Sequence, residues 1–264
     1  MEKQIIFCNC RGEIIKEDDK KLIDSILKKS AVGVVELVDL CGIAVSDPNA
    51  VSKLFTDIKE TLFIACHPRA VELLLKKSGV SSPNNISFVN LRETPAEAVE
   101  QLVAQFTSGT STSDGHLKVD APKDWNAWYP VVDEERCTSC GQCADFCLFG
   151  VYEKGEEKVN VVYPQGCKYN CPACGRVCPE MAIVFPKYTR GGAVSGANTF
   201  DEQKEHDRLQ RDTNAILGND IYKALEARKL KRRSIINAEA MKIALEERSK
   251  AEAERGNSTK NPNE

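Results

Sequence analysis

Two cysteine-rich stretches decide how this chain folds: residues 137–147 are CTSCGQCADFC, and residues 167–178 are CKYNCPACGRVC. They hold eight of the twelve cysteines, in two groups of four with nearly the same spacing. Thiolates are soft ligands, and groups of four are typical of zinc sites and of iron–sulfur clusters. Three close cysteines can wrap one face of a four-iron cluster, while a fourth, three residues further on, serves a neighbouring cluster. The repeated pattern therefore predicts two clusters that exchange their fourth ligands.

The double group resembles the two-cluster bacterial ferredoxin family over residues 131–187. The resemblance rests on both cysteine groups, on the Phe149-Gly150-Val151 run and on Pro179 after the last cysteine. It implies one [4Fe-4S] cluster on Cys137, Cys140, Cys143 and Cys178, and a second on Cys167, Cys171, Cys174 and Cys147. Leu148 stands where the family usually has proline, and one extra residue separates Cys167 from Cys171, but neither departure removes a ligand.

Zinc is the main alternative for these eight thiols. Four-cysteine zinc sites usually pair two Cys-x-x-Cys knuckles across a longer gap, and neither group contains histidine. A thioredoxin-type redox pair is disfavoured because every close cysteine pair belongs to a larger set. The spacing therefore favours iron–sulfur clusters.

Residues 1–106 alternate short apolar runs with amphipathic stretches. Runs at residues 5–7, 34–38, 62–65 and 86–89 predict strands, and periodic segments between them predict helices. This rhythm is typical of an α/β domain with a small parallel sheet covered by helices. We expect a linker over residues 107–124, an α+β ferredoxin-like domain over 125–190, and a charged, partly flexible helical extension over 191–264. Residues 152–163 predict a hairpin between the two cysteine groups, and the extension predicts two helices, near residues 201–217 and 221–254.

The remaining four cysteines all fall at the ends of predicted strands: Cys8, Cys10, Cys41 and Cys66. Because the carboxyl ends of parallel strands share one edge, the sequence sends four thiols to the same rim. We expect a metal or iron–sulfur cluster site there. Zinc, with His67 replacing a thiol, remains an alternative, as does an ordinary role for cysteine as a small buried residue.

This region also resembles the N-terminal domain of the flavin-carrying polypeptide of heterodisulfide reductase. The carrying motifs are Phe7-Cys8-Asn9-Cys10-Arg11-Gly12, Cys41 and Ala65-Cys66-His67-Pro68-Arg69. The resemblance implies a [4Fe-4S] cluster on the four rim cysteines. The flavin fingerprint of that family, G-x-G-x-x-G, does not occur in this sequence, so flavin chemistry is expected in a partner.

Composition and charge narrow the function. The chain has 264 residues with a net charge of −3. This small charge predicts neither binding to nucleic acid nor an acidic tail. Its longest apolar run is far too short to span a bilayer, and its N-terminus lacks a signal peptide, so we expect a cytoplasmic protein without disulfides. A basic run over residues 223–233 is interpreted either as a solvated helix face or as a surface that docks to an acidic partner protein. Nucleic-acid binding is not favoured.

The sequence therefore predicts a non-catalytic electron carrier. We expect single electrons to pass through two or three [4Fe-4S] clusters, with the chain serving as a subunit or partner of a larger oxidoreductase, such as a flavoprotein. We expect the helical extension to dock that partner. An iron–sulfur redox sensor and a zinc-stabilised adaptor are the alternatives from other classes.

Overall fold

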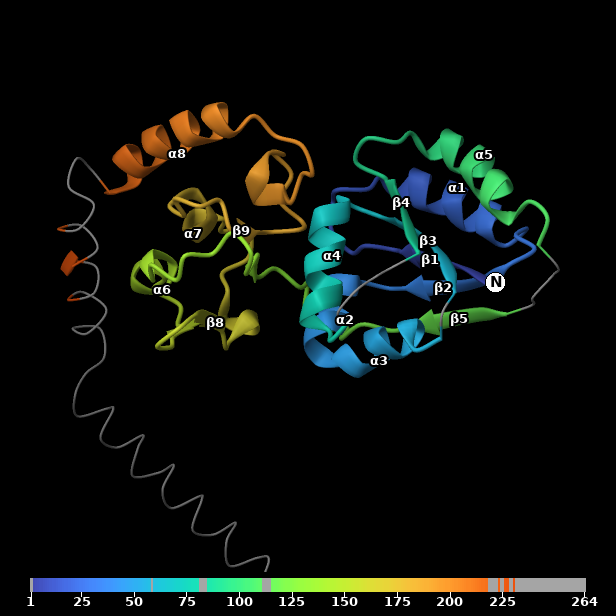
Figure 1. The fold of residues 1–264 in the computed structure, drawn as a ribbon, viewed down its shortest axis with the longest axis horizontal. Coiled ribbons are helices and arrows are strands. Elements are labelled where there is room, and N and C mark those ends of the chain that lie inside the picture. The colour runs from blue at the N-terminus through green and yellow to red at the C-terminus, as the bar shows by residue number, and fades with distance from the viewer. Residues whose placement is uncertain are drawn as a thin grey trace, which may run out of the picture.

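The first half of the chain forms a three-layer α/β structure around a parallel five-stranded sheet (Figure 1). The computed structural model describes residues 2–57, 59–80, 85–110 and 115–217, together with residues 223, 226, 227 and 230. The strand order is β4-β3-β1-β2-β5. The strands are β1 (Lys3–Cys8), β2 (Gly33–Leu37), β3 (Glu60–Ala65), β4 (Ile86–Asn90) and β5 (His116–Val119). The predicted parallel α/β architecture is confirmed.

Helices cover both faces of this sheet. Alternate strand residues such as Ile5 and Ile64 face α1 (Glu17–Leu27) and α5 (Ala96–Thr107). The opposite face packs against three helices: α2 (Leu40–Ser46), α3 (Pro48–Ser52) and α4 (Pro68–Lys77). Short 3₁₀ turns follow at Lys53–Phe55 and, later in the chain, at Pro164–Gly166 and Ala193–Ser195. With both faces covered, the strands are apolar on each side, as in other buried parallel sheets.

The fifth strand corrects the predicted linker over residues 107–124. β5 pairs in parallel with β2, with Val34 opposite His116 and Leu37 opposite Val119. Sequence periodicity misses it because β5 is a short edge strand: its first three residues are exposed, and Leu117 retains 53% of its accessible surface. Backbone pairing, rather than an apolar pattern, holds this strand.

The second half of the chain has little regular structure. β6 (Val131–Val132) pairs with β9 (Ile183–Val184), and β7 (Tyr152–Lys154) pairs with β8 (Val159–Val161), both antiparallel. The predicted hairpin between the cysteine groups is thus confirmed. Short helices α6 (Gln142–Phe146) and α7 (Ala173–Arg176) each lie inside one cysteine group.

The start of the predicted extension belongs to the folded core. The carbonyl oxygen of Val194 accepts a hydrogen bond from the backbone N–H of Phe185 at 2.7 Å, and Ala193, Val194 and Ala197 are buried. The prediction that the charged extension begins at residue 191 therefore needs correction, because this glycine-interrupted segment is apolar enough to pack. α8 (Glu202–Leu217) follows and matches the first predicted helix. The second predicted helix, around residues 221–254, lies largely outside the described residues.

The two halves share one hydrophobic core. Ala127, Tyr129, Val131 and Val184 from the second half pack in the same cluster as residues of β1, α2 and α4. Arg69 at the start of α4 donates to Asp133 Oδ2 from Nε at 3.1 Å and from Nη2 at 2.8 Å. Because the core and these bonds cross the boundary, the two halves are held in a fixed arrangement, with α4 between them (Figure 1).

Candidate metal centres

The first set of four thiols lines a narrow recess of about 20 Å³, beneath the loop that leads into α6. Gly141, between two of the cysteines, has a left-handed φ of 78°, which lets the loop turn back on itself. The backbone N–H of Ala182 donates to Cys178 Sγ at 3.4 Å. The cysteines that border this recess are those that the family resemblance assigns to one cluster: Cys137, Cys140, Cys143 and Cys178.

The second set lines a wider cavity of about 320 Å³. Its other walls are largely apolar and include Phe146, Phe149 and Val151. The Tyr152 hydroxyl donates to Cys174 Sγ at 3.1 Å. The cysteines that border this cavity come from both sequence groups: Cys147, Cys167, Cys171 and Cys174.

Burial makes these thiols poor acids in the absence of a metal. Burial, with the neighbouring Cys178 as the next cause, raises the pKa of Cys143 to about 12. Burial and the nearby Cys171 raise the pKa of Cys167 to about 12 as well. A cationic metal centre offsets both effects by binding the thiolate form, so binding would release protons. Four converging thiols whose negative charge needs compensation suit an iron–sulfur cluster.

The four N-terminal cysteines lie at the carboxyl edge of the sheet. Cys8 ends β1, Cys10 follows it, Cys41 is in α2 after β2, and Cys66 follows β3. In the sheet, β2 lies on one side of β1 and β3 lies on the other. The direction in which strands are added therefore reverses between β1 and β3. Open α/β sheets bind ligands in the crevice at such a switch point.

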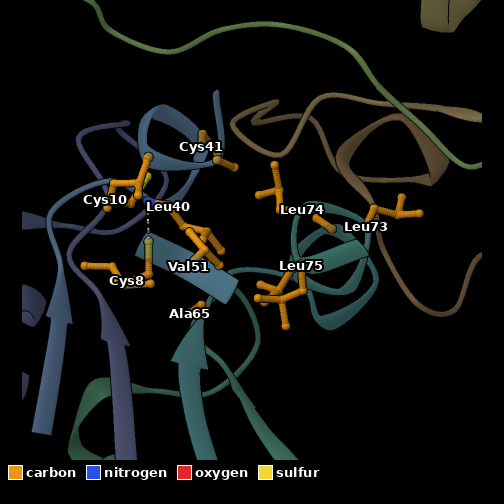
Figure 2. Packing of buried hydrophobic residues seen from close by; sticks show 14 of the residues in the cluster. Cys8, Cys10, Leu40, Cys41, Val51, Ala65, Leu73, Leu74 and Leu75 are labelled. Atoms are coloured by element: carbon orange, nitrogen blue, oxygen red, sulfur yellow. Dashed lines mark hydrogen bonds between the residues drawn. The ribbon is translucent and has the colours of Figure 1, made fainter. Parts of the chain in front are cut away.

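Backbone groups support the sulfur atoms at this rim. The N–H of Leu40 donates to Cys8 Sγ at 3.5 Å, and the N–H of Gly12 donates to Cys10 Sγ at 3.2 Å. Figure 2 shows Cys8, Cys10 and Cys41 gathered beyond the strand ends, with the Leu40 contact drawn as a dashed line. Burial and nearby negative groups raise the pKa of Cys8 and Cys41 well above the ordinary value for a thiol.

A buried ion pair lies beside these thiols. Lys187 Nζ is 2.6 Å from Asp39 Oδ2, and the side chains are only 4% and 1% exposed. Burial alone would lower the pKa of Lys187, but Cys41, Asp39 and Cys10 raise it to about 12, so the ammonium keeps its charge. The site therefore has a permanent cation supplied by the distant half of the chain.

His67, the residue that could replace a thiol in the zinc alternative, lies within hydrogen-bonding distance of Asn90. It is buried, and its Nδ1 lies 3.2 Å from Asn90 Nδ2. Burial, together with the charge of Arg92, lowers the pKa of His67 to about 4, so the imidazole is neutral. Within the described residues, no group of three or more His, Cys, Asp or Glu side chains is arranged to hold a single metal ion.

Four residues near the sites were not found by sequence reasoning: Asp39, Tyr129, Tyr152 and Lys187. Tyr129 donates its hydroxyl to the carbonyl oxygen of Cys41 at 2.9 Å, and Tyr152 contacts Cys174. An aromatic residue beside a cysteine group gives a weak signal for such contacts. Lys187 has no local signal, because its partner lies 148 residues earlier in the chain.

Comparisons with known proteins match the cysteine-rich segment. The 4Fe-4S binding domain family matches residues 130–150. An uncharacterized ferredoxin from Methanocaldococcus jannaschii is 48% identical over 61 residues, which are 23% of this chain and 42% of that relative. A second uncharacterized ferredoxin from this organism is 36% identical over 57 residues, which are 21% of this chain and 74% of the relative. The pyruvate synthase subunit PorD of Methanothermobacter marburgensis is 28% identical over 74 residues, which are 28% of this chain and 85% of that subunit.

The cysteine-rich segment is thus a 4Fe-4S ferredoxin segment. The chain belongs to the ferredoxin family, on the basis of roughly a quarter of its length. It spans less than half of the first of these relatives. None of the helices that the structure describes is both long and apolar enough to cross a membrane.

Proposed function

We propose that this chain relays single electrons through three [4Fe-4S] clusters and has no catalytic site of its own. The observation that carries this proposal is the arrangement of eight cysteines around two cavities, each bordered by four thiols drawn from both sequence groups. A [4Fe-4S] cluster gains or loses one electron, and its potential is set by hydrogen bonds, burial and nearby charge. Its chemistry needs no substrate pocket.

In this proposal Cys137, Cys140, Cys143 and Cys178 hold the first cluster. Cys147, Cys167, Cys171 and Cys174 hold the second. The crossed assignment has a direct test in four single alanine variants. Cys147→Ala and Cys174→Ala should perturb the same cluster signal in electron paramagnetic resonance spectra of the reduced protein, whereas Cys143→Ala and Cys178→Ala should perturb the other. If Cys147→Ala instead matches Cys143→Ala, the crossed assignment is wrong.

The third cluster is proposed on Cys8, Cys10, Cys41 and Cys66. Its support is the position of all four residues at the sheet edge where the strand order reverses, with backbone N–H groups already directed at two of the sulfur atoms. The heterodisulfide reductase resemblance leads to the same ligand set. Cys41→Ala should lower the iron content by about four atoms per chain, the content of one [4Fe-4S] cluster. Retention of all iron would contradict this part of the proposal.

We further propose that the chain works in the cytoplasm with a larger oxidoreductase, such as a flavoprotein or a pyruvate-synthase-type enzyme. The similarity to the PorD subunits supports an assembly of this kind. The helical extension that begins with α8 is the proposed docking element. Its charged residues, including the basic run over 223–233, would bind an acidic partner surface.

Electrochemistry distinguishes the carrier from the other two classes. An electron carrier should show fast, reversible one-electron waves when the holoprotein is adsorbed on an electrode. A redox sensor should change its partner binding on reduction, and a zinc-stabilised adaptor should show no reversible wave. The absence of reversible waves from protein with its full iron content would overturn the carrier proposal.

A further inference from the structure

Lys187 belongs to the ferredoxin-like half of the chain, but its ion-pair partner, Asp39, lies beside the N-terminal cysteines. Among the described residues, no other residue of the ferredoxin-like half forms an ion pair at this site. It lies after β9, two residues beyond Phe185 in the second half of the chain. Its ammonium group reaches Asp39 at 2.6 Å and the Asn126 side-chain oxygen at 3.1 Å. A side chain with a flexible stem is thereby fixed by both the carboxylate and the amide.

The position of Lys187 brings its charge close to the thiols. A Cβ atom added at Gly12 would lie 3.1 Å from Lys187 Cδ and 3.3 Å from Cys10 Sγ. The side chain of Lys187 and the sulfur atom of Cys10 therefore lie close to each other around Gly12. Cys41 and Lys187 also border the same small recess, together with Tyr129. The glycine at position 12 leaves the space through which the lysine stem passes beside Cys10.

Only one of the two carboxylate oxygens of Asp39 contacts the ammonium group of Lys187. Asp39 is fully buried, and its second oxygen, Oδ1, has no hydrogen-bond partner among the described residues. Burial raises the pKa of Asp39, and Lys187 is the largest of the groups that oppose this rise, ahead of Arg11 and the backbone N–H of Cys41. Lys187 in turn contacts the carboxylate, its stem passes close to Cys10, and it borders the same recess as Cys41. Arg92 and Arg11 are further cations that face the site from other elements.

We propose that Lys187 is a positioning residue that raises the reduction potential of the N-terminal cluster, and that Asp39 opposes it. Reduction adds one negative charge to a cluster, so a fixed cation nearby stabilises the reduced form and a fixed anion destabilises it. Burial strengthens both effects, because few water molecules screen the charges. This inference rests on the proposed third cluster and assigns to it a tuning element that comes from the other half of the chain.

The pair of opposite charges gives a test with opposite signs. Lys187→Gln should lower the potential of the N-terminal cluster, and Asp39→Asn should raise it. Lys187→Arg retains the charge and should leave the potential close to that of the wild type. A tenfold change in the ratio of reduced to oxidised cluster at a fixed ambient potential corresponds to about 59 mV for a one-electron couple. We expect Lys187→Gln to reach about this size.

The measurement is a redox titration in which electron paramagnetic resonance spectra report the fraction of each cluster that is reduced. The signal of the N-terminal cluster is identified as the one missing from Cys41→Ala, and the two other clusters in each sample provide an internal reference. A shift confined to the N-terminal signal, downward in Lys187→Gln and upward in Asp39→Asn, supports the proposal. If Lys187→Gln does not fold, the upward shift in Asp39→Asn and the unchanged value in Lys187→Arg still test it.

Two negative results have different meanings. A wild-type protein with about twelve irons, but with the same N-terminal potential in Asp39→Asn and Lys187→Gln, overturns the tuning role and leaves the three-cluster proposal intact. A wild-type protein with about eight irons overturns the third cluster and the role of Lys187 together. Equal shifts of all three clusters would also overturn the role, because they would indicate a global change in structure.

Discussion

Arg69 holds the two halves of the chain together, and its replacement should cost far more than the loss of a surface charge. Its guanidinium makes two bonds to Asp133 Oδ2 and reaches the carbonyl oxygens of Met181 and Ala193 at 3.3 and 3.4 Å. The side chains of Arg69 and Asp133 are only 13% and 11% exposed. Replacing Arg69 with methionine leaves the carboxylate of Asp133 largely buried without its cation.

Breaking a buried ion pair from one side costs about 3–5 kcal/mol. For a protein of this size, 1 kcal/mol lowers the thermal midpoint by roughly 2–4 °C. Arg69→Met should therefore lower the midpoint by about 6 °C or more. Lys76→Met provides the matched control, because Lys76 is also on α4 and also pairs with a carboxylate of the second half, Glu135, but the two side chains are 46% and 78% exposed. An exposed pair of this kind is worth about 1 kcal/mol or less.

The assay is thermal unfolding of the anaerobic holoprotein, followed by circular dichroism at one fixed scan rate. The expected order of midpoints is wild type, Lys76→Met slightly below it, and Arg69→Met well below both. If Arg69→Met unfolds at the same temperature as Lys76→Met, the polar contacts of Arg69 do not hold the halves together. The shared apolar core and the remaining cross-half contacts, such as Lys187 with Asp39, would then hold the halves together without a measurable contribution from Arg69.

Three further predictions concern the sites themselves. Tyr152→Phe removes the hydroxyl bond to Cys174 Sγ, so it should lower the potential of the second cluster alone, which voltammetry measures; an unchanged potential would show that this bond has no influence on the cluster. Tyr129→Phe removes the hydroxyl that donates to the buried carbonyl oxygen of Cys41, so it should destabilise the protein by about 1 kcal/mol in denaturant unfolding; equal stability would contradict this. Anaerobic iron removal with a chelator should abolish amide protection from hydrogen exchange over residues 137–178 while β1 and β3 keep theirs, because the cysteine-rich half has little regular structure without its clusters; uniform loss across the chain would contradict this expectation.

The sequence predicts the parallel sheet because its central strands are continuous apolar runs. Ile5, Ile6 and Phe7 of β1 and Leu62, Phe63 and Ile64 of β3 are buried on both faces, so their pattern gives a strong local signal. The convergence of Cys8, Cys10, Cys41 and Cys66 follows from that sheet, since parallel strands end at one edge. The two cysteine groups carry an equally local signal in their spacing.

The missed features depend on contacts between distant residues. β5 is held by its backbone bonds to β2, and its exposed Leu117 gives no sign of a buried face. Residues 193–197 are buried because they pack beside β9, although glycines interrupt their sequence. Lys187 meets Asp39 only after both halves have folded against each other. No local pattern encodes such a pair, because its two partners become neighbours only in the complete structure.

The content of iron and acid-labile sulfide tests the central claim most directly. The chain is purified without oxygen, and both elements are measured per mole of protein, with Cys41→Ala prepared in parallel. Three [4Fe-4S] clusters predict about twelve irons and about twelve sulfides in the wild type, and about eight of each in Cys41→Ala. Wild-type protein that contains zinc but no sulfide, or that contains neither iron nor sulfide, would contradict the assignment of this chain as an iron–sulfur electron carrier.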